Sequence, residues 1–247
     1  MDRVYESKKG FSKKGYTDNI TKVTKFYRNE FKKYGYSLAS LDMPKGGQAA
    51  RFKTKFEIGH LDNTRVLDVG CGFGHMLDYM KAWGINAQYT GIDICPDFIE
   101  IAKQRHPDAD FRLLNILDNN PEETWDWVFL VGALNIAPLK DHWWDFIKEM
   151  LERMFDLCTQ GVAVDFLSTY VDFQKQNAFH VSPEGIFSFA KTLTKRVALR
   201  HDYMAYEFTI YLYRNQSVTS NHIFIEYRKE LPNDLERENS SPQKNNS

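Results

Sequence analysis

Three closely spaced glycines and one carboxylate are the residues of this chain whose types and spacing could do chemistry. Gly70, Gly72 and Gly74 follow a short, mostly apolar run over 66–69, which is typical of a buried strand. Glycines at alternate positions let the backbone turn tightly and approach a ligand closely. A second apolar run ends at Asp93, about 20 residues further along. This arrangement is typical of a nucleotide site at the edge of a parallel sheet.

The spacing of the glycines separates this loop from two common nucleotide motifs. A dinucleotide fingerprint is G-x-G-x-x-G, in which the third glycine permits close packing of the helix on the strand. In this chain the position of that third glycine is occupied by His75. A Walker loop requires the sequence Gly-Lys-Ser or Gly-Lys-Thr, which the chain does not contain. The loop is therefore neither a standard dinucleotide loop nor a Walker loop.

Three further segments extend the pattern along the chain. Asp93 stands at the end of the second strand, 111–116 reads Phe-Arg-Leu-Leu-Asn-Ile, and 125–132 reads Trp-Asp-Trp-Val-Phe-Leu-Val-Gly. Together with the glycine loop, which matches (D/E)-x-G-x-G-x-G, they resemble the motifs of class I S-adenosylmethionine (SAM) dependent methyltransferases over roughly residues 60 to 213. The resemblance implies an α/β fold with a Rossmann-like, doubly wound, seven-stranded sheet, a C-terminal antiparallel strand, and SAM as cofactor.

The resemblance implies a role for each residue at a motif position. Asp93 would accept hydrogen bonds from both ribose hydroxyls, and Asp68 would orient the methionine amino group. Ile94 and Ile116 would sandwich the adenine ring. Asn115 stands where the family usually has an aspartate, and its amide oxygen would accept without charge, which predicts modestly weaker binding. The residues expected to bind the cofactor are Asp68, Gly70, Cys71, Gly72, Gly74, Asp93, Ile94, Asn115, Ile116, Gly132 and Arg51.

Residues that act on the methyl acceptor should lie beyond the carboxyl ends of strands, where open α/β sheets bind ligands. An amine acceptor needs only to arrive unprotonated, whereas a hydroxyl or carboxyl acceptor can need a base. The candidates are His201 beside Asp202, His180 before a helix, and Tyr170 after the fifth strand. A histidine at a strand end is more often structural than catalytic. Arg51 is likewise either a partner of the methionine carboxylate or a solvated helix residue.

The segment after the fourth strand bears on the class of acceptor. DNA and RNA amino-methyltransferases carry (D/N)-P-P-(Y/F) there, whereas 132–135 reads Gly-Ala-Leu-Asn. The catalytic cysteine of pyrimidine C5 enzymes is missing from its Pro-Cys setting. We therefore expect a small-molecule acceptor methylated at oxygen or nitrogen, with nucleic acid disfavoured.

Three other functions are compatible with the same scaffold. The first is a SAM-binding partner subunit without chemistry of its own. The second is an RNA or protein methyltransferase that uses the basic N-terminus, since residues 1–60 carry 14 Lys and Arg against 6 Asp and Glu. The third, an aminopropyl transferase, lacks the acidic pair expected after the fourth strand.

The composition limits the remaining function classes. The chain has 247 residues, of which 43% are hydrophobic, and a formal net charge of −1, so a generally basic nucleic-acid binder is excluded. Cys71, Cys95 and Cys158 form neither a CxxC pair nor a zinc pattern, so we expect reduced thiols and no metal. The chain has no signal-peptide pattern and no run of about 18 apolar residues, which predicts a cytoplasmic protein without a membrane partner. The oligomeric state is not indicated.

The elements that must position these residues alternate between strand and helix, as in a doubly wound sheet. The predicted strands are 65–69, 89–93, 110–114, 125–131, 161–166 and an antiparallel pair at 196–200 and 207–213. The predicted helices are 19–35, 48–60, 73–83, 96–105, 141–158 and 183–193. The predicted organisation is an N-terminal helical lid at 1–60 with poor order over 1–18, a methyltransferase domain at 61–213 and an extension at 214–247. That extension is compatible with one more strand within 217–229 and should be disordered after 231.

Overall fold

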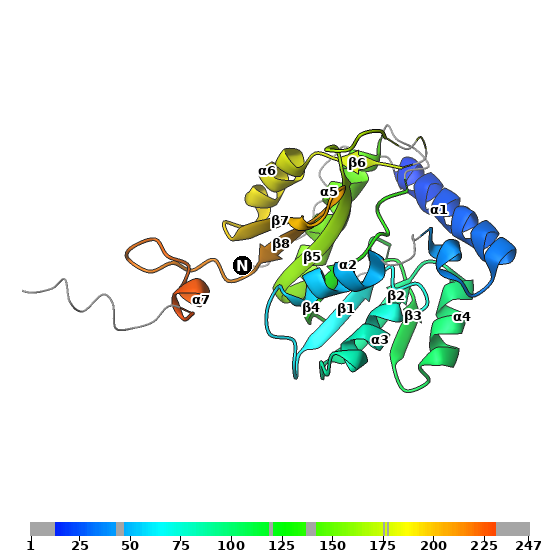
Figure 1. Cartoon of the computed structure of the whole chain (residues 1–247), viewed down its shortest axis with the longest axis horizontal. Helices are drawn as coiled ribbons and strands as arrows, with labels where there is room; N and C mark the ends of the chain where they lie inside the picture. The colour runs from blue at the N-terminus through cyan, green and yellow to red at the C-terminus, as the bar shows by residue number, and fades with distance from the viewer. Residues whose placement is uncertain are drawn as a thin grey trace, which may run out of the picture. The chain divides into compact units, whose positions relative to one another are not determined.

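The computed structural model describes residues 13–42, 47–118, 121–136, 142–174, 176 and 178–230 (Figure 1). It divides into two compact units, Met1–Arg214 and Asn215–Ser247. The first unit carries the sheet and every candidate site residue, and the described part of the second contains a β-bridge and the short helix α7 (Ile225–Arg228). None of the described helices is both long enough and apolar enough to span a bilayer.

The first unit is built on a mixed sheet whose strand order is β3-β2-β1-β4-β5-β8-β7. β8 runs antiparallel to both of its neighbours, β5 and β7, whereas the pairs from β3 to β5 are parallel. The order and the antiparallel hairpin confirm the predicted class I methyltransferase fold. The strands are β1 (Arg65–Val69), β2 (Gln88–Asp93), β3 (Asp110–Leu113), β4 (Trp125–Leu130), β5 (Cys158–Ser168), β6 (His180–Val181), β7 (Val197–Met204) and β8 (Glu207–Tyr213).

Helices cover both faces of the sheet because successive strand residues point to opposite faces. Trp127 and Phe129 pack with Phe52 of α2 and Met76 of α3, whereas Val128 packs on the other face, with α5 and α6. Strands buried on both faces are almost continuously apolar, which is the pattern of the central strands here. The helices of this unit are α1 (Lys13–Tyr34), α2 (Gly47–Phe56), α3 (His75–Ala82), α4 (Pro96–Arg105), α5 (Trp143–Leu157), α6 (Pro183–Leu193) and the 3-10 helix η1 (Leu38–Leu41).

Two prolines fix helix starts where the sequence predicted them. Pro96 opens α4 and Pro183 opens α6, because the ring presets the helical φ and the missing N–H has no partner in a first turn. Ser182 caps α6, its hydroxyl accepting from the Gly185 N–H at 3.0 Å. β6 pairs with the end of β5 and leads directly into α6, so the ends of both strands lie beside the start of this helix (Figure 1).

Several predicted boundaries were wrong. α1 begins at Lys13, so 13–18 is helical rather than poorly ordered. α2 ends at Phe56 instead of residue 60, because Gly59 approaches Trp127 so closely that a Cβ there would lie 2.7 Å from the indole ring. The indole N–H of Trp127 donates to the His60 carbonyl at 3.0 Å, which fixes the chain outside the helix.

The predicted strand within 217–229 was also wrong. This segment forms a single bridge between Val218 and Phe224, and then the four-residue helix α7. His222 has a φ of +62°, a left-handed conformation that turns the chain before α7. The two-residue strand β6, which pairs with β5 at Leu167 and Ser168, was not predicted. The disorder predicted for 1–12 and after 231 lies outside the described residues.

Candidate active site

A cavity opens at the carboxyl ends of β1, β2 and β4, where the glycine loop lies. Its floor is formed by the residues that follow these strands, including Gly70 to Gly72, Asp93, Ile94 and the turn that begins at Gly132. Nine of the eleven residues predicted to bind the cofactor line this donor pocket, namely Asp68, Gly70, Cys71, Gly72, Asp93, Ile94, Asn115, Ile116 and Gly132.

The glycine loop is held by hydrogen bonds to the neighbouring strand. The amides of Gly70 and Cys71 donate to the Ile92 carbonyl at 2.8 and 3.0 Å. Gly70 has a φ of +74°, and a Cβ on it would lie 2.7 Å from the Cβ of Ala133. The position therefore requires glycine both for its backbone conformation and for the close approach of the turn after β4.

Gly74, the third glycine of the loop, does not line the pocket. It precedes α3 with a φ of +76°, and a Cβ there would lie 2.7 Å from the ring of Phe111. The lack of a side chain at Gly74 thus allows α3 to begin in close contact with β3. Gly74 is not placed to touch a ligand in the pocket. This is the packing role that the third glycine of a dinucleotide loop has, moved one residue earlier along the chain.

Asp93 lines the pocket and is buried. One carboxylate oxygen accepts from the Gly72 amide at 2.9 Å and the other from the Cys95 amide at 2.8 Å. Burial raises the pKa of Asp93 to about 6, although the backbone donors partly oppose that shift. Each carboxylate oxygen has further acceptor capacity, so the pair of oxygens fits a vicinal diol such as a ribose.

Asp68 is a second buried carboxylate on the pocket wall. One oxygen accepts from the Tyr89 hydroxyl at 2.8 Å. Burial raises the pKa of Asp68 to about 7, which the Tyr89 hydrogen bond limits. Among the described residues, no lysine or arginine contributes to the pKa shift of Asp68. A buried carboxylate without a cation fits a ligand that brings one, such as the methionine ammonium of SAM.

The part of the pocket predicted to hold the adenine is apolar. Ile94, Ile116, Phe98 and Leu114 contribute to its wall. The Asn115 side chain is already engaged locally, because its Oδ1 accepts from the Leu117 amide at 3.2 Å and its Nδ2 donates to Asp118 at 2.8 Å. These bonds fix the orientation of Asn115 at the pocket edge.

The sequence predicted a lid over residues 1–60 but did not indicate which residues cover the pocket. They come from the N-terminal segment, from His75 and from α5, and they are Ile20, Val23, Tyr27, Leu41, Gln48, Phe52, His75, Trp143, Phe146 and Met150. In α1 the apolar residues Ile20, Val23 and Tyr27 recur at helical spacing, so one face of this helix lines the pocket. Tyr27 contacts Phe98 edge-on at 5.8 Å, which places α1 against the start of α4.

His75, which replaces the fingerprint glycine, faces the donor pocket. Its Nδ1 lies 3.4 Å from the Gln48 amide nitrogen of α2. Burial, together with the nearby Arg105, lowers the pKa of His75 to about 4. The imidazole is therefore neutral near pH 7, so its Nδ1 can accept from Gln48.

The residues predicted to act on the acceptor do not line the donor pocket. His180 Nδ1 lies 2.8 Å from the Ser168 carbonyl, whereas its buried Nε2 has no hydrogen-bond partner in the described chain. Asp202 pairs with the guanidinium of Arg200 at 2.7 Å, not with His201. The ring of His201 instead lies 6.3 Å from that of Tyr170, between centroids.

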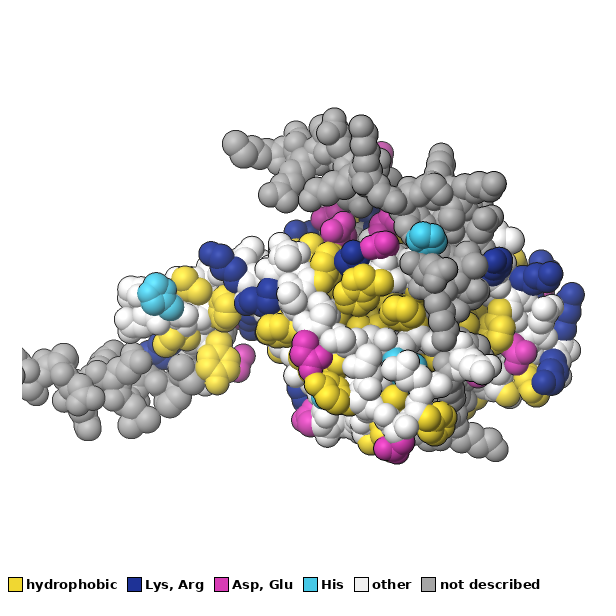
Figure 2. Space-filling model, turned by 90° about the horizontal axis from the view of Figure 1, so that it is seen from above, with side chains coloured by type: hydrophobic (Ala, Val, Ile, Leu, Met, Phe, Trp, Pro, Cys, Tyr) yellow, Lys and Arg dark blue, Asp and Glu magenta, His cyan; other side chains and the backbone are white. Residues whose placement is uncertain are grey.

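The face of the molecule seen from above is mixed in character (Figure 2). Hydrophobic side chains gather in its middle, and Lys and Arg side chains gather at one edge. Tyr170, Phe173 and Tyr206 are exposed aromatic residues near the end of β5. The hydroxyl of Tyr170 donates to Glu184, and that of Tyr206 donates to Asp172 at 2.7 Å.

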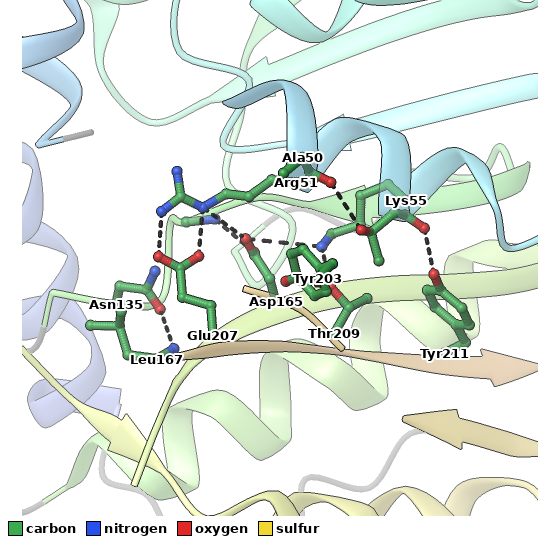
Figure 3. Close-up of polar contacts among 12 residues, drawn as sticks. Ala50, Arg51, Lys55, Asn135, Asp165, Leu167, Tyr203, Glu207, Thr209 and Tyr211 are labelled. Carbon is green, nitrogen blue, oxygen red and sulfur yellow. Dashed lines mark hydrogen bonds and ion pairs between the residues drawn. The ribbon is translucent and has the colours of Figure 1, made fainter. Parts of the chain in front are cut away.

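Arg51 lies beside the donor pocket in a buried polar cluster made by Arg51, Lys55, Asp165, Glu207 and Thr209 (Figure 3). The Arg51 guanidinium donates twice to Glu207, from Nε at 2.6 Å and from Nη2. Lys55 Nζ donates to Thr209 at 2.8 Å. Burial lowers the pKa of Lys55 to about 8. The cluster joins α2 to β5 and β8.

Within this cluster one guanidinium nitrogen of Arg51 remains available. Arg51 Nη1 is buried and has no hydrogen-bond partner among the described residues. It lies at the N-terminus of α2, where a Cβ on Gly47 would be 3.0 Å away.

No group of three or more His, Cys, Asp or Glu side chains among the described residues could hold a metal ion.

Comparison with known proteins agrees with this geometry. A family model described as "Methyltransferase domain" matches residues 66–161. The Mycobacterium tuberculosis protein Rv1506c, which carries a provisional methyltransferase name, is 32% identical over 157 residues, covering 60% of this chain and 92% of the relative.

Two solved structures share the fold at low identity. The N-methyltransferase NodS of Bradyrhizobium japonicum, in complex with S-adenosylhomocysteine, has a TM-score of 0.57 at 15% identity, covering 77% of this chain and 97% of NodS. The magnesium protoporphyrin IX methyltransferase ChlM of Synechocystis, with bound SAM, has a TM-score of 0.54 at 14% identity, covering 84% of this chain and all of ChlM. Of the two, ChlM holds SAM and NodS holds S-adenosylhomocysteine. The relative and the family model, together with the shared fold, show that this chain belongs to the class I SAM-dependent methyltransferases.

Proposed function

We propose that this protein transfers the methyl group of SAM to an oxygen or nitrogen atom of a small-molecule acceptor. The observation that carries the proposal is the cover over the donor pocket. Residues of α1, η1 and α2 line the pocket together with the glycine loop, among them Val23, Leu41 and Gln48. A donor pocket covered in this way favours a small acceptor over a polymer. ChlM, which shares the fold, acts by its name on magnesium protoporphyrin IX, and this acceptor is also a small molecule.

In this proposal the chain's own residues mainly bind and orient the donor. Bound SAM supplies an electrophilic methyl group on its sulfonium. Asp93 holds the ribose, Asp68 faces the methionine ammonium, and Arg51 Nη1 with the first amides of α2 receives the methionine carboxylate. Since methyl transfer is an in-line displacement, correct placement of the two substrates accounts for much of the rate.

An oxygen acceptor would also need a proton acceptor. If Nδ1 of His180 carries the ring proton and donates to the Ser168 carbonyl, Nε2 is left with a free lone pair. His180 is therefore our first candidate for a general base, with His201 and Tyr170 as alternatives. His180 pairs with Leu167 at the end of β5, and the rings of Tyr170 and His201 lie 6.3 Å apart. The Leu167 amide donates to Asn135, so the end of β5 also contacts the turn after β4.

The proposed activity is tested by incubating the protein with isotopically labelled SAM and a metabolite extract, followed by mass spectrometry. We expect a labelled small product and S-adenosylhomocysteine. Tight SAM binding without turnover would support a non-catalytic subunit instead, and label in RNA or protein would support a polymer acceptor. With an oxygen acceptor, His180→Ala should lower turnover by about 100-fold or more without weakening SAM binding.

We further propose that residues 1–60 act as a lid that excludes water from the donor pocket. α1 contacts the pocket through Ile20, Val23 and Tyr27, and Arg28 pairs with Asp97 of α4 at 3.0 Å. Hydrogen exchange of the α1 amides should therefore slow when S-adenosylhomocysteine is added. Exchange in α6, which does not line the pocket, serves as the internal control. Equal exchange in α1 with and without the ligand would contradict the lid.

A further inference from the structure

Asp165 joins the buried polar cluster to the donor pocket. It lies on β5 and is completely buried. Its Oδ1 accepts from the Gly132 amide at 2.8 Å. Its Oδ2 has no hydrogen-bond partner in the described chain, but it lies 3.7 Å from Arg51 Nε and 3.9 Å from Lys55 Nζ (Figure 3). The carboxylate is thus held between two cations while it accepts from the turn after β4.

The turn that Asp165 holds is part of the pocket floor. Gly132 has a φ of +74° and lines the pocket together with Ala133 and Leu134. At its other end, Asn135 Oδ1 accepts from the Leu167 amide at 3.2 Å. The turn is therefore fixed to β5 at both ends, by the Asp165 side chain and by the Leu167 backbone.

The surrounding charges explain why a carboxylate can be buried here. Arg51 is neutralised by Glu207, so Asp165 and Lys55 form the second opposite pair of the cluster. A buried charge is tolerated when opposite charges and hydrogen bonds compensate its desolvation. Lys55 has a pKa of about 8, so it can lose its proton at small cost if the opposite carboxylate is removed.

We propose that Asp165 is a positioning residue for the methyl donor. Its hydrogen bond from Gly132 fixes the turn against which the methionine end of SAM lies, and α2 holds Asp165 in place through Arg51 and Lys55. The inference rests on the proposed function in one respect, namely that the turn at Gly132 contacts the donor.

Two variants of Asp165 separate the hydrogen bond from the charge, and a third variant is the control. Asp165→Asn keeps an oxygen that can accept from Gly132 and removes the charge, whereas Asp165→Glu keeps the charge and displaces the oxygens by one methylene. We expect Asp165→Glu to raise the Kd of SAM about tenfold and Asp165→Asn to change it by less than about threefold. Tyr211→Phe is the matched control. It removes the hydrogen bond from the Tyr211 hydroxyl of β8 to the Thr54 carbonyl of α2, which does not involve the turn after β4.

The control should lower Tm without changing the Kd of SAM, because it does not touch the turn. Equal changes in Kd for all three variants would reduce Asp165 to a structural role and overturn the proposal. A normal Kd for Asp165→Glu, or a larger effect for Asp165→Asn, would overturn it too. Loss of affinity in Asp93→Ala tests the donor site separately, so the two failures are distinguishable.

A measurement on the wild-type chain covers the case in which Asp165→Glu does not fold. The Gly132 amide should be protected from hydrogen exchange both before and after S-adenosylhomocysteine is added, because its acceptor belongs to the protein. Protection that arises only after the addition would show that the ligand orders the turn, which contradicts the proposal.

Discussion

Replacing Asp93 by alanine is expected to weaken the binding of SAM by about 2–3 kcal/mol, the scale of hydrogen bonds to a charged group. The variant removes the proposed acceptor of both ribose hydroxyls. It also frees the amides of Gly72 and Cys95, which the carboxylate now holds at 2.9 and 2.8 Å. Isothermal titration calorimetry with SAM measures the loss directly.

Asp62→Ala is a suitable control for this variant. Asp62 also accepts from a backbone amide, that of Asn86 at 2.8 Å, but it does not line the pocket. The control should leave the affinity for SAM unchanged. If a folded Asp93→Ala protein binds SAM as tightly as the wild type does, Asp93 is not the ribose ligand.

Replacing Asp68 by asparagine should remove a dependence of SAM binding on pH. The pKa of Asp68 is about 7 in the ligand-free protein, and the methionine ammonium favours the ionised carboxylate. SAM affinity of the wild type should therefore rise between about pH 6 and 7.5, with release of a proton on binding. The asparagine variant should bind more weakly at pH 7.5, and its affinity should depend less on pH. Calorimetry at several pH values measures both effects.

The same variant should be relatively more stable at high pH. Folding raises the pKa of Asp68 from its usual 3.8 to about 7, so the stabilisation that Asp68 contributes is present below pH 3.8 and is lost as the pH rises through 7. When the pH is raised from 3.8 to 7, the free energy of unfolding of Asp68→Asn should increase by about 2–4 kcal/mol relative to that of the wild type. The amide can still accept from Tyr89. Parallel pH trends for the two proteins, followed by denaturant unfolding without ligand, would contradict the assignment.

Local chemistry made much of the fold predictable. Pro96 and Pro183 mark helix starts. The bounds of two strands also follow from apolar patterns, a short mostly apolar run for β1 (Arg65–Val69) and an alternating one for β8 (Glu207–Tyr213). Boundaries set by a distant contact were not predictable. The end of α2 depends on Trp127 of β4, and no local pattern reports how closely Gly59 approaches that ring.

The same distinction applies to the candidate site. The glycine loop and Asp93 lie within one strand–helix–strand segment, so their spacing along the chain is sufficient to place them together. For Arg51 the sequence left two roles open, a cofactor contact and a solvated helix residue. It could not decide between them because the partner of Arg51, Glu207, lies 156 residues further along. Asp202 was expected beside His201, but a carboxylate next to an arginine two residues earlier pairs with that arginine instead.

The antiparallel insertion of β8 between β5 and β7 has a consequence for the order in which the protein can fold during synthesis. α2 emerges early, yet the carboxylate of Glu207 and the hydroxyl of Thr209 that its cations contact belong to one of the last strands. Until β8 has left the ribosome, α2 cannot bury Arg51 and Lys55 at low cost. The donor pocket can therefore acquire its complete cover only after nearly all of the first unit has been made.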